Sequence, residues 1–464
     1  MRKIRLDTSH LALAVGMFGL FRVMALPLGD PDQFWHLQVG QYIVTHMAVP
    51  VTDPFSFTMA GRPWTAHEWL YEVVMYLVYR VAERWSLMAL NLVLFGVAVG
   101  FSVAWARLRG GGRFASAVWG AVAALLMTPF VAFRPQVASY ALFAVFLYVI
   151  ERGRDRPGLY WWLPPLMVLW ANIHASFVLG LGLVFLDVLV AMRDPVRLRN
   201  LATVGVAVFL AALVNPHGWH LLVYSFGTAS SLTMRENIVE WASPDFKSPY
   251  GMLMALFIFV TVFRLLRSSR AKASDIILLA VFTYMFLSSA RYAPYLLLWG
   301  SAANGFLTPS ERLPAAVPWW LGVASAVALA VGVAVLLPPR DLAAGVSTSE
   351  FPVKLVDYMA LHPPDGPVFN DYGWGGYLIW RLWPTTKVFI DGRADLYMEG
   401  SVFDDYLQTV RLQTDPQAVF ARYGVRWVLV RRQSPLARYL EIAPGWALVK
   451  QDDVGALYRE VGPP

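Results

Sequence analysis

The chain has 464 residues, of which 57% are hydrophobic and only 15% charged, a composition outside the range of ordinary soluble globular proteins. A net charge of +7 would suggest nucleic acid as the partner of a soluble protein, but here the basic residues fall mostly in alternate loops and indicate membrane topology instead. The absence of cysteine excludes disulfides, thiolate nucleophiles and cysteine-ligated metal sites.

Apolar runs of the length that a bilayer requires, about twenty residues each, recur until about residue 338. The first follows a basic N-terminus and lacks a small-residue cleavage site, so we interpret it as a retained helix. We predict about eleven spans, near residues 9–28, 86–106, 114–132, 136–150, 159–173, 175–192, 200–215, 250–266, 274–290, 292–307 and 315–338.

The stretch at 69–81 is ambiguous. Counting it as a span would place the arginine cluster at 107–113 outside, against the positive-inside rule. An amphipathic helix on the outer surface puts that cluster and the later basic loops inside. We therefore expect a cytoplasmic N-terminus, an external first loop at 29–85 and an external C-terminal tail.

After about residue 340 the composition becomes ordinary, and strand-like runs alternate with helical stretches. The expected strands are 367–370, 387–390, 426–430 and 447–450, and the expected helices lie near 375–382, 401–412 and 415–423. This alternation predicts an α/β domain with a mostly parallel sheet. We predict two domains: a transmembrane helical domain at 1–340, which includes the first external loop, and a soluble extracytoplasmic α/β domain at 341–464.

With sidedness assigned, unusual polar residues gather at the outer ends of the spans. Asp30 and Asp32 open the first external loop, where acids close to lipid are costly and call for a reason. The other polar residues expected on this side are His36, His67, Glu68, Arg134, Asn172, His174, His217 and Arg291, with Asp391 and Arg393 in the tail. Their joint occurrence at one face favours a water-accessible polar cavity.

Each of these residues also has a structural explanation. Asp30 is well placed to cap the helix that follows it. The arginines are long enough to snorkel to phospholipid headgroups, and the histidines match no zinc motif. None of these explanations predicts acids, arginines and histidines together at one face.

Chemically, this set suits the transfer of a group from a lipid-linked phosphate. Two carboxylates spaced as Asp-x-Asp can share a divalent cation such as Mg or Mn, or one can bind while the other acts as a base. Arginine or a metal stabilises the phosphate that leaves. The sequence therefore indicates a catalytic pair, Asp30 and Asp32, which are also the candidate metal ligands.

Five motifs resemble those of a group of bacterial membrane proteins in the GT-C superfamily of membrane glycosyltransferases. They are D-x-D-x-x-W-H-L-x-x-G at 30–40, D-P-F-S at 53–56, H-E-W-L at 67–70, W-G-G-Y-L at 374–378 and I-D-G-R at 390–393. The resemblance implies an α-helical polytopic protein of the bacterial cytoplasmic membrane, with an acidic external loop, surface helices and an external C-terminal domain.

The resemblance further implies a glycosyltransferase that takes a sugar from a polyprenyl-phosphate-linked donor to an extracytoplasmic glycan, lipid or protein acceptor, with inversion in our interpretation. Asp30 or Asp32 would be the base or metal ligand, and Arg134 or Arg291 would hold the donor phosphate. The expected acceptor-side residues are His36, His67, Glu68, Asn172, His174, His217, Asp391 and Arg393. Two alternatives stay open: a transporter or flippase of a lipid-linked glycan, and a non-catalytic membrane assembly factor.

Overall fold

The computed structural model describes residues 8–308, 319–398 and 400–462. Packing divides the chain into two compact units. Unit 1 comprises Met1–Leu26 and Leu87–Pro338, and unit 2 comprises Pro27–Ser86 and Pro339–Pro464. The loop at 29–85, for which the sequence predicts an external location and which we call the first external loop, packs with the C-terminal tail into one unit. The change of composition near residue 340 does not reveal this grouping.

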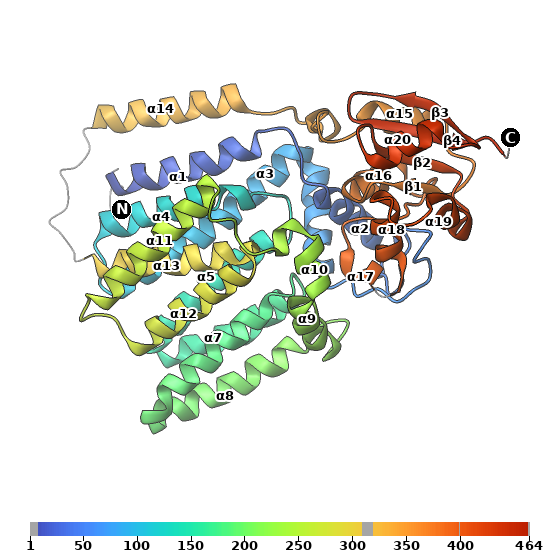
Figure 1. Ribbon diagram of the computed structural model, residues 1–464. Coiled ribbons are helices and arrows are strands. Elements are labelled where there is room, and N and C mark those ends of the chain that lie inside the picture. Colours follow the sequence, from blue (N-terminus) through green and yellow to red (C-terminus); the bar gives the residue numbers. More distant parts are fainter. Residues whose placement is uncertain (1–7, 309–318, 399, 463–464) are drawn as a thin grey trace. The chain divides into compact units, whose positions relative to one another are not determined.

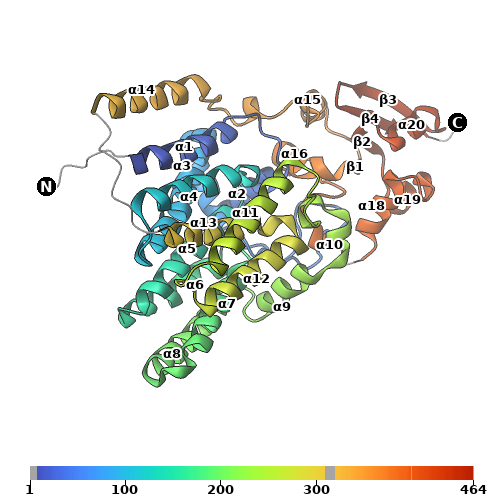
Figure 2. The same cartoon turned by 60° about the vertical axis from the view of Figure 1, so that its left-hand side comes forward.

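Unit 1 is a bundle of apolar helices (Figure 1). Its helices are α1 Thr8–Met24, α4 Arg113–Leu126, α5 Gln136–Gly153, α6 Leu163–Ala171, α7 Phe177–Val190, α8 Pro195–Ala212, α9 His220–Ser230, α10 Leu232–Asn237, α11 Pro249–Leu266, α12 Ala273–Ser288, α13 Ala293–Leu307 and α14 Trp319–Leu336. Within the bundle α7 and α8 lie side by side, as Figures 1 and 2 both show. Each apolar run that the sequence predicts coincides with a helix; residues 315–318 of the last run lie outside the described residues.

Three helices of the described residues are long and apolar enough to cross a membrane, judged by length and composition. They are α3 (Trp69–Leu108), α8 and α11. Shorter apolar helices include α1, α4 and α12. The number of about eleven spans stays a prediction.

Helix α3 is interrupted near its middle. Ala82 (φ −151°, ψ 30°) and Glu83 (φ 50°, ψ −124°) have non-helical dihedrals, and a positive φ is unfavourable for a residue with a side chain. The Ser86 hydroxyl lies 2.6 Å from the carbonyl oxygen of Val78 and 2.9 Å from that of Glu83 and shares its one proton between these two acceptors, which meets part of the hydrogen-bond demand that the break creates. The break separates the segment at 69–81 from the apolar run that follows.

Unit 2 combines one sheet with short helices. Its strands are β1 Val368–Asn370, β2 Trp427–Arg431, β3 Trp446–Gln451 and β4 Gly455–Glu460, in the order β1-β2-β4-β3. Its helices are α2 Asp32–His46, α15 Val353–Leu361, α16 Gly375–Leu382, α17 Ala394–Met398, α18 Val402–Val410, α19 Pro416–Tyr423 and α20 Pro435–Ile442, together with the first part of α3. The three tail helices that the sequence predicts are therefore present.

The prediction of a mostly parallel sheet is wrong. Only β1 and β2 pair in parallel, whereas β4 pairs antiparallel with both β2 and β3. The turn between Gln451 and Gly455 is too short for a crossover and forces a hairpin. The expected strand at 387–390 is also absent: there Val388 forms isolated bridges with Val368 and with Ser56 of the first external loop.

An aromatic cluster joins the loop to the tail inside unit 2. The Phe34 ring of α2 is fully buried, and its centroid lies 5.3 Å from those of Tyr377 and Trp380 of α16 and 5.4 Å from that of Phe351. Burial of one such ring stabilises a fold by about 1.5–3 kcal/mol. The cluster thus fixes α2, and with it the acidic motif, against the tail.

Candidate functional site

Helix α2 is the element that carries the acidic motif. Asp30 Oδ1 accepts a hydrogen bond from the Asp32 amide at 2.9 Å, so Asp30 satisfies one of the amides that a helix leaves unpaired at its start. Asp32 is the first residue of α2 and is half-buried. Because residues four apart share a face of a helix, Asp32, His36 and Gly40 follow one another along α2.

The I-D-G-R motif of the tail reaches this face at Gly392. A Cβ atom at position 392 would clash with Asp32 Oδ1 and would lie 3.1 Å from Trp35 Nε1. Only glycine permits this approach of backbone to side chain. Folding therefore brings together two motifs that lie at opposite ends of the sequence.

The neighbouring Arg393 is the centre of a buried ion-pair network. Its guanidinium donates to Asp391 through Nε (2.8 Å) and Nη2 (2.7 Å) and to Asp53 through Nη1 (2.7 Å). The Tyr397 hydroxyl donates to Asp391 Oδ2. Arg393 also lies over the Trp64 ring, 4.6 Å from its centroid. This network joins the first external loop to the tail within unit 2.

Asp53 is a residue that the sequence analysis did not assign. Its carboxylate accepts hydrogen bonds from the amides of Phe55 and Ser56, each at 3.0 Å, besides the ion pair with Arg393. Burial alone would raise the pKa of Asp53, but Arg393 and the hydrogen bonds from the Ser56 side chain and the Phe55 amide together hold it below its ordinary value. The available signal was the D-P-F-S motif, since an aspartate two or three residues before free amides commonly orders a turn.

A second buried cluster surrounds His36. Its Nδ1 lies 2.9 Å from Glu72 Oε1 and 3.7 Å from Glu68 Oε2, and all three residues are buried. On its other side Glu68 lies 3.7 Å from His67 Nε2. Within the described residues this is the one group of three or more histidines and acids close enough to hold a metal ion. The sequence analysis missed Glu72, whose signal was its four-residue spacing from Glu68 at a helix start.

The predicted metal ligands Asp30 and Asp32 do not form such a group. Among the described residues, no third histidine or acid completes a site with them, and Asp30 already caps α2. The arrangement therefore does not fit a divalent cation held by this pair and a third ligand of those types, and we derive no step from one.

In unit 1 the two predicted phosphate-binding arginines lie beside one carboxylate. Arg134 Nη1 donates to both oxygens of Glu240, at 3.0 and 3.1 Å. The Arg291 guanidinium lies over Trp241, 4.0 Å from the ring centroid. The positive charge of Arg134 lowers the pKa of Glu240 against the effect of burial, and Arg291 lowers it further. Both arginines thus act on the charge of Glu240.

The remaining predicted residues of unit 1 have backbone or hydroxyl partners. The Asn172 side chain donates to two backbone carbonyls, at 2.8 and 2.7 Å. His174 Nδ1 accepts from the Ser176 amide at 3.1 Å, and the His217 amide donates to the Asn215 side chain at 2.9 Å. These contacts position all three residues. Their role in binding the acceptor stays a prediction.

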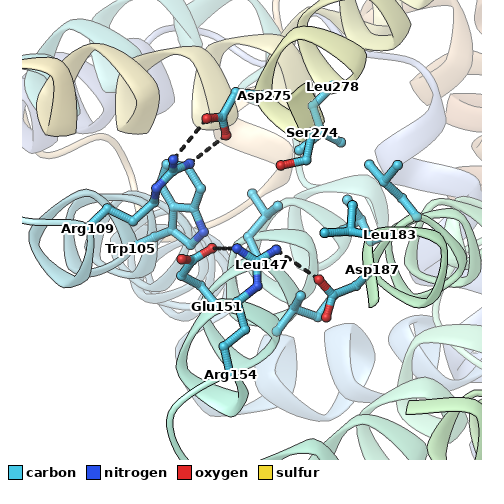
Figure 3. Close-up of a pocket in the computed structure, with 13 residues that line it drawn as sticks. Trp105, Arg109, Leu147, Glu151, Arg154, Leu183, Asp187, Ser274, Asp275 and Leu278 are labelled. Carbon is cyan, nitrogen blue, oxygen red and sulfur yellow. Dashed lines mark hydrogen bonds and ion pairs between the residues drawn. The ribbon is translucent and has the colours of Figure 1, made fainter. Parts of the chain in front are cut away.

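A small cavity of about 30 Å³ in unit 1 is lined by a different kind of cluster. Figure 3 shows Arg109 paired with Asp275 and Arg154 paired with both Glu151 and Asp187. The closest N–O distances are 2.5 Å for the first pair and 2.8 Å for each of the other two. Since each carboxylate has an arginine, we interpret this cluster as a connection between helices.

No family model and no curated protein matches the sequence. Solved structures match the fold. The Archaeoglobus fulgidus oligosaccharyltransferase with a tethered acceptor peptide aligns at 9% identity and TM-score 0.57, covering 91% of this chain and 69% of that one. ArnT from Cupriavidus metallidurans in the apo state aligns at 16% identity and TM-score 0.56, covering 98% and 99%.

The arabinofuranosyltransferase AftD from mycobacteria aligns at 14% identity and TM-score 0.56 over 99% of this chain, which spans 42% of that protein. All three are glycosyltransferases of the GT-C fold. At these identities the likeness establishes the fold. The predicted GT-C resemblance is therefore confirmed at the level of architecture.

Proposed function

We propose that the chain is a membrane glycosyltransferase that moves a sugar from a polyprenyl-phosphate-linked donor to an acceptor at the extracytoplasmic face. The GT-C fold supports this class of activity. The observation that carries the proposal is the position of Asp32, a half-buried carboxylate at the start of α2 that the tail meets at Gly392. A base fixed in this way suits proton abstraction from an acceptor.

In the proposed reaction Asp32 takes the proton of the acceptor hydroxyl. The oxygen attacks the anomeric carbon of the sugar from the face opposite the phosphate, and the bond from that carbon to the phosphate oxygen breaks. The electron pair leaves with the polyprenyl phosphate, so the product is inverted. Asp32 ranks above Asp30 because Gly392 of the tail approaches the Asp32 carboxylate, whereas Asp30 accepts a hydrogen bond from the Asp32 amide.

Arg134 and Arg291 are the proposed ligands of the donor phosphate. Guanidinium groups bind phosphate through short charge-assisted hydrogen bonds and stabilise its developing charge. The positive charge that both arginines place at Glu240, where they lower the pKa of that carboxyl group, supports this role.

His36, His67, Glu68, Asn172, His174 and His217 are the proposed acceptor-side residues. For Asp391 and Arg393, which are buried against each other, we propose a positioning role through Gly392. The Archaeoglobus fulgidus oligosaccharyltransferase has also been solved with Zn and sulfate, at 10% identity and TM-score 0.52, which supports a metal and an oxyanion as ligands of this fold. The proposed location is the bacterial cytoplasmic membrane, with the N-terminus inside and the tail outside.

Native mass spectrometry with a panel of polyprenyl-phosphate sugars tests the proposal. The wild type is compared with Asp32→Asn and with the control Asp357→Asn, which alters an exposed acid of unit 2 that pairs with Arg381. We expect all three proteins to bind the donor and only Asp32→Asn to lose sugar release or transfer. Donor binding without turnover in the wild type and the control would favour a transporter, and no binding by the wild type would exclude a lipid-linked donor.

A further inference from the structure

We propose that His36, Glu68 and Glu72 form a binding site for a divalent first-row transition metal such as zinc. The proposal does not depend on the glycosyltransferase activity. It rests on the ligand set, the geometry and an unsatisfied buried oxygen.

The ligand set is one that such metals prefer. An imidazole nitrogen and two carboxylate oxygens are common zinc ligands, and a site with three protein ligands keeps its fourth position open for water or substrate. None of the three ligating atoms lies more than 4.8 Å from another. All three residues are buried, so an ion here would be largely shielded from solvent.

The distances suit a tetrahedral ion. Bonds of 2.0–2.1 Å in tetrahedral geometry separate neighbouring ligand atoms by about 3.3 Å. His36 Nδ1 lies 2.9 Å from Glu72 Oε1 and 3.7 Å from Glu68 Oε2, on either side of that value. Small side-chain rotations would therefore complete the coordination.

The polypeptide is built to hold the two segments close. A Cβ atom at Gly40, one turn after His36, would clash with the backbone carbonyl of Glu72, so glycine permits α2 and the start of α3 to meet at this point. Glu68 and Glu72 are four residues apart and share one face. The Trp35 and His36 ring centroids lie 3.6 Å apart, and this contact restricts the orientation of the imidazole.

An independent observation points to a missing ligand. Glu72 is only 1% exposed, and within the described residues its Oε2 atom has no hydrogen-bond partner. Burying a carboxylate oxygen without a partner is expensive. A histidine–glutamate hydrogen bond explains Oε1 alone, whereas a cation between the three side chains offsets the charge of the whole carboxylate.

The consequence concerns the start of α2. Asp32 lies four residues before His36 and therefore on the same face. A metal bound to His36 would fix the orientation of this face and add positive charge one helical turn from the proposed base. It would also cross-link α2 to the start of α3 inside unit 2.

Metal content and cobalt spectroscopy on the full chain in detergent test the site. Protein stripped with chelator and reloaded with Zn²⁺ should hold about one ion per chain, and Co²⁺ should give the visible absorption bands of a tetrahedral N/O site. His36→Ala, Glu68→Gln and Glu72→Gln should each weaken metal binding by at least about tenfold.

Three matched controls should keep the wild-type stoichiometry. His46→Ala removes an exposed histidine of the same helix, Glu83→Gln removes an acid at the break of α3, and Asp32→Asn removes the proposed base. The melting temperature should rise with Zn²⁺ in the wild type and controls but not in the ligand variants, which also identifies a variant that fails to fold.

The site is contradicted if stripped wild-type protein takes up no Zn²⁺ or Co²⁺. It is equally contradicted if the three ligand variants, folded by their melting curves, bind the ion as the wild type does. Loss of binding in Asp32→Asn alone would move the metal to the acidic motif. Because none of these readouts requires turnover, their failure is separate from a failure of the proposed activity.

Discussion

The cavity cluster of unit 1 and the His36 cluster of unit 2 both bury carboxylates, but they balance charge differently. In the first, three arginines serve three acids: Asp275 pairs with Arg109, Asp187 with Arg197 and Arg154, and Glu151 with Arg154. In the second, two glutamates face one imidazole. A buried charge is tolerated only when it is compensated. The comparison teaches that charge-matched pairs are sufficient as structure, whereas the buried Glu72 Oε2 atom, which has no hydrogen-bond partner within the described residues, is the basis for our proposal of a cation.

The Arg393 network lies between these cases, with one arginine for two acids, and it gives the largest expected effect on stability. Arg393→Met should destabilise the protein by about 3–5 kcal/mol, because Asp53 and Asp391 stay buried without their partner. Thermal unfolding in detergent measures this loss of stability. Arg381→Gln, which breaks a partly exposed pair with Asp357, should cost at most about 1 kcal/mol. Equal effects of the two variants would contradict the assignment of Arg393 as the centre of a buried ion-pair network.

A double-mutant cycle on Arg109 and Asp275 sharpens the comparison. Each single change, Arg109→Met or Asp275→Leu, leaves one buried charge unmatched and should destabilise unit 1, whereas the double variant should recover most of the loss. We expect a coupling free energy of about 0.5–3 kcal/mol. Additive losses would show that the pair does not act as a unit and that the cavity cluster is not the charge-matched connection described above.

Gly392→Ala tests the contact between the tail and the proposed base. The added methyl group clashes with Asp32 Oδ1, so we expect Asp32 to be displaced and turnover to fall, with overpacking costing about 1–3 kcal/mol of stability. Gly182→Ala is the control, since a Cβ there meets nothing within 4 Å. Wild-type turnover in Gly392→Ala would contradict a role for the contact between Gly392 and Asp32 in the proposed reaction.

The pH dependence of stability tests the Asp53–Arg393 pair and should be the smallest effect. The folded pKa of Asp53 is lower than its ordinary value of 3.8, so the carboxylate stabilises the fold above that value. This contribution is lost as the pH falls through the lowered folded pKa. Melting temperatures measured from about pH 6 to about pH 2, roughly two units on either side of the ordinary pKa of an aspartate, should fall more steeply for the wild type than for Asp53→Asn. Parallel curves would exclude the pair as a source of acid sensitivity.

Much of the architecture followed from periodicity and composition. The apolar runs correspond to helices, and α16, α18 and α19 fall where the tail pattern predicted them. The direction in which the strands pair could not be predicted from strand propensity. The short turn before β4 determines it, and the sequence analysis did not predict β4 itself. The stretch at 387–390 is apolar but pairs with the first external loop, a long-range contact that local pattern does not encode.

The candidate site was predictable only in part, because it also depends on contacts between segments that are distant in the sequence. Asp30 and Asp32 were found because acids beside an apolar run are unusual, but their different roles depend on one backbone hydrogen bond. Glu72 was missed because it lies in an otherwise apolar helix start, and only the close approach at Gly40 brings it to His36. Arg393 was found as an unusual residue, whereas its partner Asp53 lies far away in the sequence.

The most direct test of the proposed function is the rate of sugar release from a bound polyprenyl-phosphate donor, measured in a single turnover by mass spectrometry. The account predicts that Asp32→Asn lowers this rate by about 10²–10⁴-fold while donor binding is kept. Asp30→Ala should act mainly through loss of the hydrogen bond to the Asp32 amide at the start of α2, at a cost of about 0.5–2 kcal/mol in stability. Equal rates in the wild type and Asp32→Asn would contradict the assignment of Asp32 as the base.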